Sequence, residues 1–161
     1  MKTLIAYSSK YGTTRDCANR LARKLKGPSV VIDLSRSKPD PRIYDAVIIG
    51  GPVYMGKMNR PTASYCATYA GHIGDKPLGL FICHMDRETD VDQQISNVFP
   101  PELVDKSSVS KGFGGAYIVS RMGFLYKMII KKATGVDSDK RDVLLSEIDE
   151  FAKKFNELLG D

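Results

Sequence analysis

The sequence predicts an α/β protein with a doubly wound, three-layer architecture, in which helices cover both faces of a five-stranded parallel sheet. Short apolar runs alternate with helix-like stretches along the chain, which is typical of βαβ units. The third run, residues 46–49, contains no polar side chain, as expected of a strand buried on both faces. A candidate ligand loop follows the first strand, which favours the strand order 2-1-3-4-5.

The first half of the chain supplies three strands and two helices. Residues 3–7 and 30–34 are short runs rich in aliphatic side chains, and the helical spacing between them predicts a helix at 15–26. Residues 46–49 are the third strand. A proline suits the first turn of the helix expected at 61–72.

The second half continues the alternation. Residues 77–83 are an apolar fourth strand, and a short helix at 88–98 ends before two prolines. A fifth strand is expected at about 112–119. Apolar residues repeat on one face over 140–159, which predicts a final amphipathic helix. We expect one domain over residues 1–161.

Composition places the chain among globular proteins. Of its 161 residues 42% are hydrophobic and 27% are charged, which excludes disordered and collagen-like chains. No apolar run approaches the roughly 20 residues of a membrane-spanning helix, and the N-terminus does not resemble a signal peptide. A cytoplasmic protein is therefore expected.

Charge and metal-ligand content exclude two further classes. The 24 Lys and Arg against 19 Asp and Glu give a net charge of +5, but no recognised motif accompanies this charge, so we expect no nucleic-acid binding. The three cysteines and two histidines form no metal-binding pattern, and no metal site is predicted.

The loop at residues 8–14 is the first candidate site. It offers hydroxyl groups, a lysine ammonium and the backbone N–H groups of the following helix, which suit a phosphate. It lacks the glycine patterns of nucleoside triphosphate and dinucleotide sites, so a terminal phosphate monoester is favoured. The alternative is a helix N-cap. The residues expected to hold the phosphate are Ser9, Lys10, Tyr11, Gly12, Thr13 and Thr14.

This loop resembles the phosphate loop of the flavodoxins, in which a hydroxyl residue, two variable positions, glycine, a variable position and threonine follow one another. The resemblance covers essentially the whole chain. It implies a flavodoxin-like fold and a bound flavin mononucleotide, FMN. Flavodoxins that shuttle electrons are typically acidic, and the positive charge of this chain departs from that pattern.

A second loop, at residues 51–58, leaves the third strand at the point where the strand order reverses. A flavin ring needs apolar and aromatic surfaces, and Tyr54 is the candidate for stacking on it. By resemblance this is the ring-binding loop, where a peptide next to Gly56 reorients when the flavin is reduced. An ordinary surface turn is the alternative. The expected contacts are Pro52, Val53, Tyr54, Met55 and Gly56.

A third loop follows the fourth strand and is expected to offer backbone donors to the pyrimidine edge of the flavin. Its residues are Cys83, His84, Met85, Asp86 and Arg87. His84 is either a proton donor or a solvated loop histidine. Cys83 at a strand end is expected to be a small buried hydrophobe. The sequence does not identify a catalytic residue.

The stretch from Arg121 to Lys132 combines large apolar side chains with positive charges, at spacings that fit a helix. It is either a core-packing helix with solvated lysines, or a basic apolar surface for a membrane, a quinone or an anionic substrate.

This stretch, the start Met-Lys-Thr-Leu-Ile and residues 134–141 are similar to the flavodoxin-like, menaquinone-dependent protoporphyrinogen oxidases of heme biosynthesis. That resemblance implies a quinone as electron acceptor, a porphyrinogen as anionic substrate and peripheral contact with the inner face of the membrane.

Three functions follow. The first is an FMN oxidoreductase or electron-transfer flavoprotein that works with a redox partner protein or a quinone. The second is protoporphyrinogen oxidation. The third, from another class, is a non-redox phosphate-binding α/β module such as a phosphorylation receiver. A receiver needs acidic residues after the first strand and an aspartate after the third, where this chain has serines and glycines.

Overall fold

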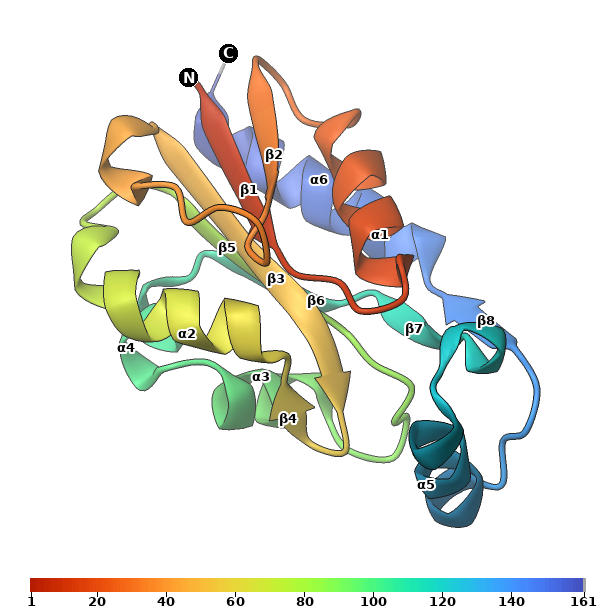
Figure 1. The fold of residues 1–161 in the computed structure, drawn as a ribbon. Coiled ribbons are helices and arrows are strands. Elements are labelled where there is room, and N and C mark those ends of the chain that lie inside the picture. Colours follow the sequence, from red (N-terminus) through yellow and green to blue (C-terminus); the bar gives the residue numbers. More distant parts are fainter. Residues whose placement is uncertain (161) are drawn as a thin grey trace.

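The computed structural model describes residues 1–160, and its centre is a parallel sheet with the order β2-β1-β3-β5-β6 (Figure 1). Because β4 (Lys57–Met58) only pairs antiparallel with the end of β3, this is the predicted order 2-1-3-4-5, and the fold class is confirmed. The central strands are β1 (Thr3–Tyr7), β2 (Ser29–Asp33), β3 (Ala46–Tyr54), β5 (Leu78–Cys83) and β6 (Val109–Gly112).

Helices cover both faces of the sheet (Figure 1). One face carries α1 (Thr13–Ala22) and α6 (Leu145–Leu159). The other carries α2 (Arg60–Tyr69), α3 (Val91–Val98) and α4 (Pro101–Lys106). Three single-turn 3-10 helices lie in connections: η1 (Pro41–Ile43), η2 (Ala70–His72) and η3 (Val119–Arg121).

The alternation of side chains along the strands builds two hydrophobic cores. Leu4 of β1 faces α2, α3 and α4, whereas the next residue, Ile5, faces α1 and α6. Under α6, the rings of Phe81 and Phe113 stack with centroids 4.7 Å apart. The two cores hold β1 and β3 rigidly, and these strands position the loops at their carboxyl ends.

The fifth strand differs from the prediction. It is β6, which ends at Gly112, whereas Gly114–Tyr117 forms β7 outside the central sheet. Gly114 has a φ of 69°, a left-handed conformation that turns the chain away from β6. β7 pairs antiparallel with β8 (Lys140–Val143).

The last helix also begins later than expected. Residues 140–143 belong to β8, and α6 starts at Leu145. The N–H of Leu144 donates to the carbonyl of Phe113, 2.8 Å away, which holds the chain extended up to that point. The predicted apolar face of α6 is otherwise confirmed, with Ile148, Phe151 and Phe155 fully buried.

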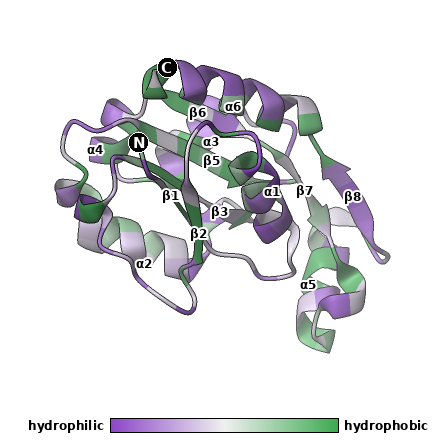
Figure 2. Ribbon diagram, turned by 90° about the horizontal axis from the view of Figure 1, so that it is seen from above, coloured by the Kyte–Doolittle hydropathy of each residue, from purple (hydrophilic) through white to green (hydrophobic). Residues whose placement is uncertain are grey.

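Residues 114–143, from β7 to β8, form an insertion between the sheet and α6. Its helix α5 (Phe124–Thr134) stands away from the body, and hydrophobic segments lie along it (Figure 2). Only Ile130 of α5 is buried, whereas Phe124 and Leu125 keep 76% and 75% of their surface exposed. The core-packing interpretation of this stretch is therefore wrong.

Candidate functional site

The three predicted loops converge at the carboxyl ends of β1, β3 and β5. They enclose a narrow recess, to which the insertion contributes three residues of β7 that the sequence did not point to. The recess is lined by Ser9, Tyr11, Thr13, Thr14, Pro52, Val53, Tyr54, Cys83, His84, Met85, Gly115, Ala116 and Tyr117.

The other predicted residues border this recess. Lys10 and Gly12 line an outer hollow of about 420 Å³, together with three arginine side chains. Met55, Gly56, Asp86 and Arg87 line a groove on the opposite side of Tyr54. The structure thus brings all of the candidate residues to one edge of the sheet.

The loop at residues 8–14, called the phosphate loop here after the family it resembles, leaves the first turn of α1 without a side-chain cap. Gly12 is the N-cap, with a φ of 99°, and it has no side chain that could accept from the N–H groups of the first turn. Within residues 1–160, the N–H groups of Thr13, Thr14 and Arg15 have no acceptor. The N-cap interpretation of the serines and threonines is therefore wrong, and the unsatisfied donors fit a phosphate group.

Two serines of this loop have structural roles. The Ser8 hydroxyl lies 2.7 Å from that of Thr62 on α2, and Thr62 in turn donates to the carbonyl of Gly50 at 3.0 Å. These bonds join β1, β3 and α2. The Ser9 hydroxyl accepts from the N–H of Gly12 at 3.0 Å and so shapes the loop.

The second loop is a tight hairpin. β3 continues to Tyr54, so Pro52 and Val53 belong to the strand, and the turn consists of Met55 and Gly56 alone. Both turn residues have positive φ, 51° and 76°, as in a type I′ turn. Burial raises the pKa of Tyr54, so its phenol stays protonated at neutral pH and can donate a hydrogen bond.

The third loop is held from inside by His84. Its side chain is only 3% exposed, so the solvated-histidine interpretation is wrong. Nδ1 lies 2.8 Å from the carbonyl of Asp86, which can only accept, so this nitrogen carries the proton. Nε2 is buried without a partner among the described residues, and burial lowers the pKa of the ring. The neutral form is therefore favoured.

Backbone groups of the same loop remain available. The N–H of His84 donates to Gly114 at 2.8 Å, but those of Met85, Asp86 and Arg87 have no acceptor in the described part of the chain. The Arg87 guanidinium pairs with Asp142 of β8 at 2.7 Å. Cys83 is a free, buried cysteine, and the neighbouring Cys17 thiol and burial raise the Cys83 pKa, as expected of a small buried hydrophobe.

Three tyrosines form a cluster at this edge. Tyr11 of the phosphate loop, Tyr54 of the hairpin and Tyr126 of α5 have ring centroids 6.2 Å apart in each pair. The Lys10 ammonium lies 3.8 Å from the centroid of Tyr126, in cation–π contact. Burial raises the pKa of Tyr11 to about 12. Tyr126 was missed by sequence reasoning because no local pattern relates α5 to the first loop.

A family comparison identifies this arrangement. Residues 4–143 match the model of the flavodoxin domain. The chain belongs to the flavodoxin domain family. The protoporphyrinogen IX dehydrogenase [quinone] of Escherichia coli K12 is 22% identical to this flavodoxin-domain chain over 171 aligned positions, which cover 98% of the chain and 94% of the relative.

Solved structures agree with the fold. The flavodoxin of Streptococcus pneumoniae TIGR4 superposes with a TM-score of 0.65 at 14% identity, over 96% of this chain and 97% of that one. The FMN-bound flavodoxin of Fusobacterium nucleatum gives 0.53 at 13% identity, over 68% of each chain. Family membership and this FMN-bound neighbour support FMN as the cofactor of this chain.

The groove beside Tyr54 is the second feature of this edge. Its volume is about 700 Å³, and the hairpin, the third loop, α3 and α5 form its walls. Ile130 and Val136 supply apolar surface, Arg87 and Lys140 supply positive charge, and Asp86 and Glu88 supply negative charge. A hollow of this size accommodates a small organic molecule.

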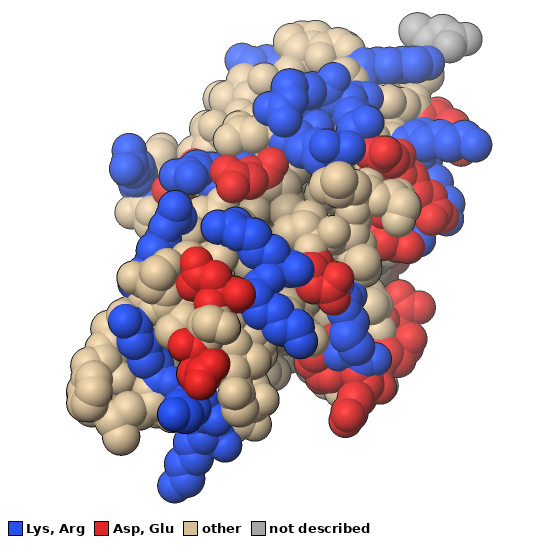
Figure 3. Space-filling view, turned by 90° about the vertical axis from the view of Figure 1, so that its right-hand side faces the viewer, with Lys and Arg blue, Asp and Glu red and all other residues tan. Residues whose placement is uncertain are grey.

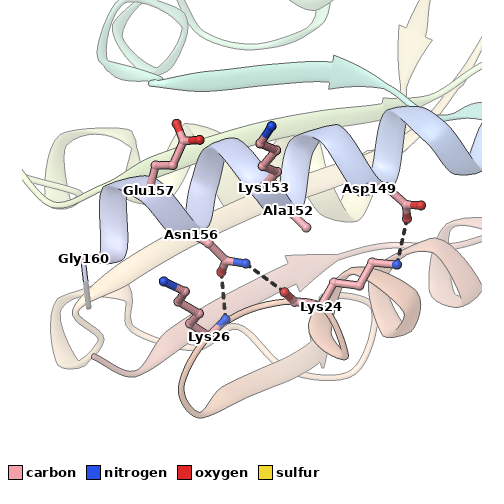
Figure 4. A pocket seen from close by; sticks show the side chains of 8 residues that line it. All are labelled: Lys24, Lys26, Asp149, Ala152, Lys153, Asn156, Glu157 and Gly160. Carbon is pink, nitrogen blue, oxygen red and sulfur yellow. Dashed lines mark hydrogen bonds and ion pairs between the residues drawn. The ribbon is translucent and has the colours of Figure 1, made fainter.

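A separate cleft of about 710 Å³ lies beside α6, at the amino ends of the strands (Figure 4). Several of its polar groups pair with one another: the Asn156 side chain bonds to the backbones of Lys24 and Lys26, and the Lys24 ammonium pairs with Asp149. None of the predicted site residues lines it. Among residues 1–160 no cluster of His, Cys, Asp and Glu has the arrangement of a metal site.

Proposed function

We propose that this protein is an FMN-dependent oxidoreductase whose three convergent loops hold the cofactor. The uncapped first turn of α1 carries this proposal, because it offers unsatisfied donors to an anion at the carboxyl edge of the sheet. FMN, when bound, supplies the reversible uptake and release of electrons. The protein supplies its position and its electrostatic surroundings.

Each loop has a distinct task in this proposal. The N–H groups of residues 13–15 and the Thr14 hydroxyl hold the phosphate. Tyr54 and the hairpin bind the ring, and the free N–H groups of residues 85–87 bind its polar edge. The buried His84 positions this third loop through Asp86 and keeps its own proton on Nδ1.

A ligand comparison tests the phosphate assignment. The Thr14 side chain lines the recess and is 1% exposed, so Thr14→Val removes a hydroxyl with little change of shape. We expect the Kd for FMN to rise about tenfold, the equivalent of one hydrogen bond to a charged group, as measured by quenching of flavin fluorescence. Riboflavin lacks the phosphate, so its affinity should not change.

Thr68→Val is the matched control, because the Thr68 hydroxyl is exposed on α2 and bonds only to its own helix. It should bind FMN like the wild type. Equal losses of FMN and riboflavin affinity in Thr14→Val would refute the phosphate assignment, and failure of the wild type to bind FMN would refute the whole proposal.

A second candidate function is oxidation of a porphyrinogen with transfer of the electrons to a quinone. The 700 Å³ groove favours it, since a pure electron carrier needs no large hollow beside its flavin. Lys140 on its wall, and Arg87, which also pairs with Asp142, suit the propionates of a porphyrinogen. The E. coli relative bears this activity in its name and aligns over nearly its full length.

The exposed face of α5 supports work at a membrane surface. It presents Phe124, Leu125, Met128 and Ile129, next to three lysines of the same helix. Basic side chains are spread over this side of the molecule, with acidic ones between them (Figure 3). An apolar helix face flanked by lysines suits an anionic bilayer surface. No helix within residues 1–160 has the length and apolar character to cross a bilayer.

Two measurements test this candidate. Protoporphyrinogen IX and a menaquinone analogue are added anaerobically to the FMN-loaded protein, and porphyrin fluorescence is followed. Formation of porphyrin is the expected result. A protein that binds FMN but forms no porphyrin would be an electron carrier and not this enzyme.

Sedimentation with phosphatidylglycerol vesicles tests the membrane contact. Phe124→Ser should release the protein from the vesicles, whereas Ile43→Ser, at a similarly exposed position on η1, should not. Equal sedimentation of both variants and the wild type would contradict the role of α5.

A further inference from the structure

The insertion has a small core of its own, and one member of that core comes from the phosphate loop. Val119, Met122 and Ile130 are its buried residues. Tyr11 packs against them together with tyrosines and a valine of the insertion. Tyr11 is therefore part of the phosphate loop and also packs in the core of the insertion.

Two polar contacts strengthen this junction. The Arg121 guanidinium, at the end of η3, donates to the carbonyl of Tyr11 at 2.6 Å. The Tyr126 ring receives the Lys10 ammonium on its face, 3.8 Å from the centroid. Lys10 and Tyr11 are consecutive residues of the phosphate loop, so the insertion contacts this loop at two adjacent residues.

The same ring of Tyr126 also contacts the hairpin. It meets Tyr54 edge to face, with an interplanar angle of 87°. The rest of α5 adds little to the junction, because Ile130 is its only buried residue among those described. A segment with so few buried contacts has low local stability, and its packing depends on the loops it touches.

We propose that Arg121 and Tyr126 couple the packing of α5 to the occupancy of the flavin site. A ligand that orders the phosphate loop and the hairpin also orders the surface on which α5 rests. Linkage makes this coupling reciprocal. The factor by which the ligand favours the packing of α5 is also the factor by which loss of the α5 contacts lowers the affinity for the ligand. Arg121 and Tyr126 are thus positioning residues, and this inference rests on the proposed assignment of the two loops to FMN.

Hydrogen exchange on the full chain, with and without FMN, tests the coupling. We expect FMN to slow exchange in residues 8–14 and 52–56, and also in residues 119–134 of the insertion. The wild type alone decides this point, so no variant has to fold. Protection of both loops with no change in residues 119–134 would overturn the coupling and leave the FMN assignment intact. No protection anywhere would overturn both.

Variants test the reciprocal effect. Arg121→Ala and Tyr126→Ala should each raise the Kd for FMN by about fivefold or more, the lower end of common coupling strengths, and should abolish the slowing in residues 119–134. Tyr126→Phe keeps the ring and should match the wild type. Lys131→Ala is the matched control on α5, since the Lys131 side chain is exposed. Unchanged FMN affinity in both alanine variants would refute the inference.

Discussion

Replacing Gly12 by alanine tests the geometry of the phosphate loop directly. Gly12 has a φ of 99°, where a residue with a side chain is strained by roughly 1–2 kcal/mol. The new Cβ would lie 3.0 Å from Nη2 of Arg15 and 3.2 Å from Nη1 of Arg121. The Arg15 end is flexible and can move away, and the contact with Arg121, whose Nη1 donates to the carbonyl of Tyr11, needs a shift of only a few tenths of an ångström. The backbone strain therefore dominates the effect.

This strain has to appear in one of two measurements. If the loop keeps its conformation without FMN, Gly12→Ala lowers the free energy of unfolding of the apoprotein by about 1–2 kcal/mol in urea denaturation. If the loop relaxes until FMN binds, stability is unchanged and the Kd for FMN rises about 5- to 30-fold instead. The loss of unfolding free energy and the loss of FMN binding free energy should sum to about 1–2 kcal/mol.

Gly71→Ala is the control. Gly71 lies in η2 with an ordinary φ and open space around its Cα, so this change should stay within about 0.5 kcal/mol of the wild type. Apoprotein stability and FMN affinity that are both unchanged in Gly12→Ala would refute the left-handed conformation at Gly12.

Three further predictions concern stability. Met55→Asn should raise the free energy of unfolding by up to about 1 kcal/mol, because asparagine tolerates the φ of 51° better than methionine does; a lower urea midpoint would contradict this. Thr62→Val should lower it by about 1–3 kcal/mol, since the buried Ser8 hydroxyl loses its partner, and calorimetry showing no change would disprove that role. Burial lowers the folded-state pKa of His84 below 6.5, so the unfolded chain binds more protons and the free energy of unfolding should fall as the pH drops through about 6.5. His84→Gln should lack this pH dependence. Equal pH dependence of the two chains in urea titrations would exclude His84 as its source.

The central fold was predictable because its signals are local. Each of the first four strands is a short apolar run, and the observed bounds fall within a residue or two, except that β3 runs on to Tyr54. β6 was misplaced because its sequence, Val-Ser-Lys-Gly, is a short edge strand with little apolar content. Its assignment depends on pairing with β5, which no local pattern reports.

The candidate site was predictable only where it is contiguous in sequence. The phosphate loop and the hairpin each lie within a few residues, so their composition was informative. Tyr117 and Tyr126 reach the same edge from the insertion, more than a hundred residues after Tyr11, and only the folded chain brings them there. The burial of His84 was missed for the same reason, because Gly112 and Gly115 make room for it from outside the loop.

The antiparallel pairing of β7 with β8 brings the two ends of the insertion together. Gly114 faces Val143 across the two strands, and the bond from Leu144 to Phe113 closes the junction just beneath them. The chain thus leaves and re-enters the sheet domain at one place, so the path from β6 into α6 does not depend on the course of the residues between. The insertion therefore enters the fold twice, through the paired ends that continue the chain and through Tyr117, Arg121 and Tyr126, which return to the loops of the candidate site.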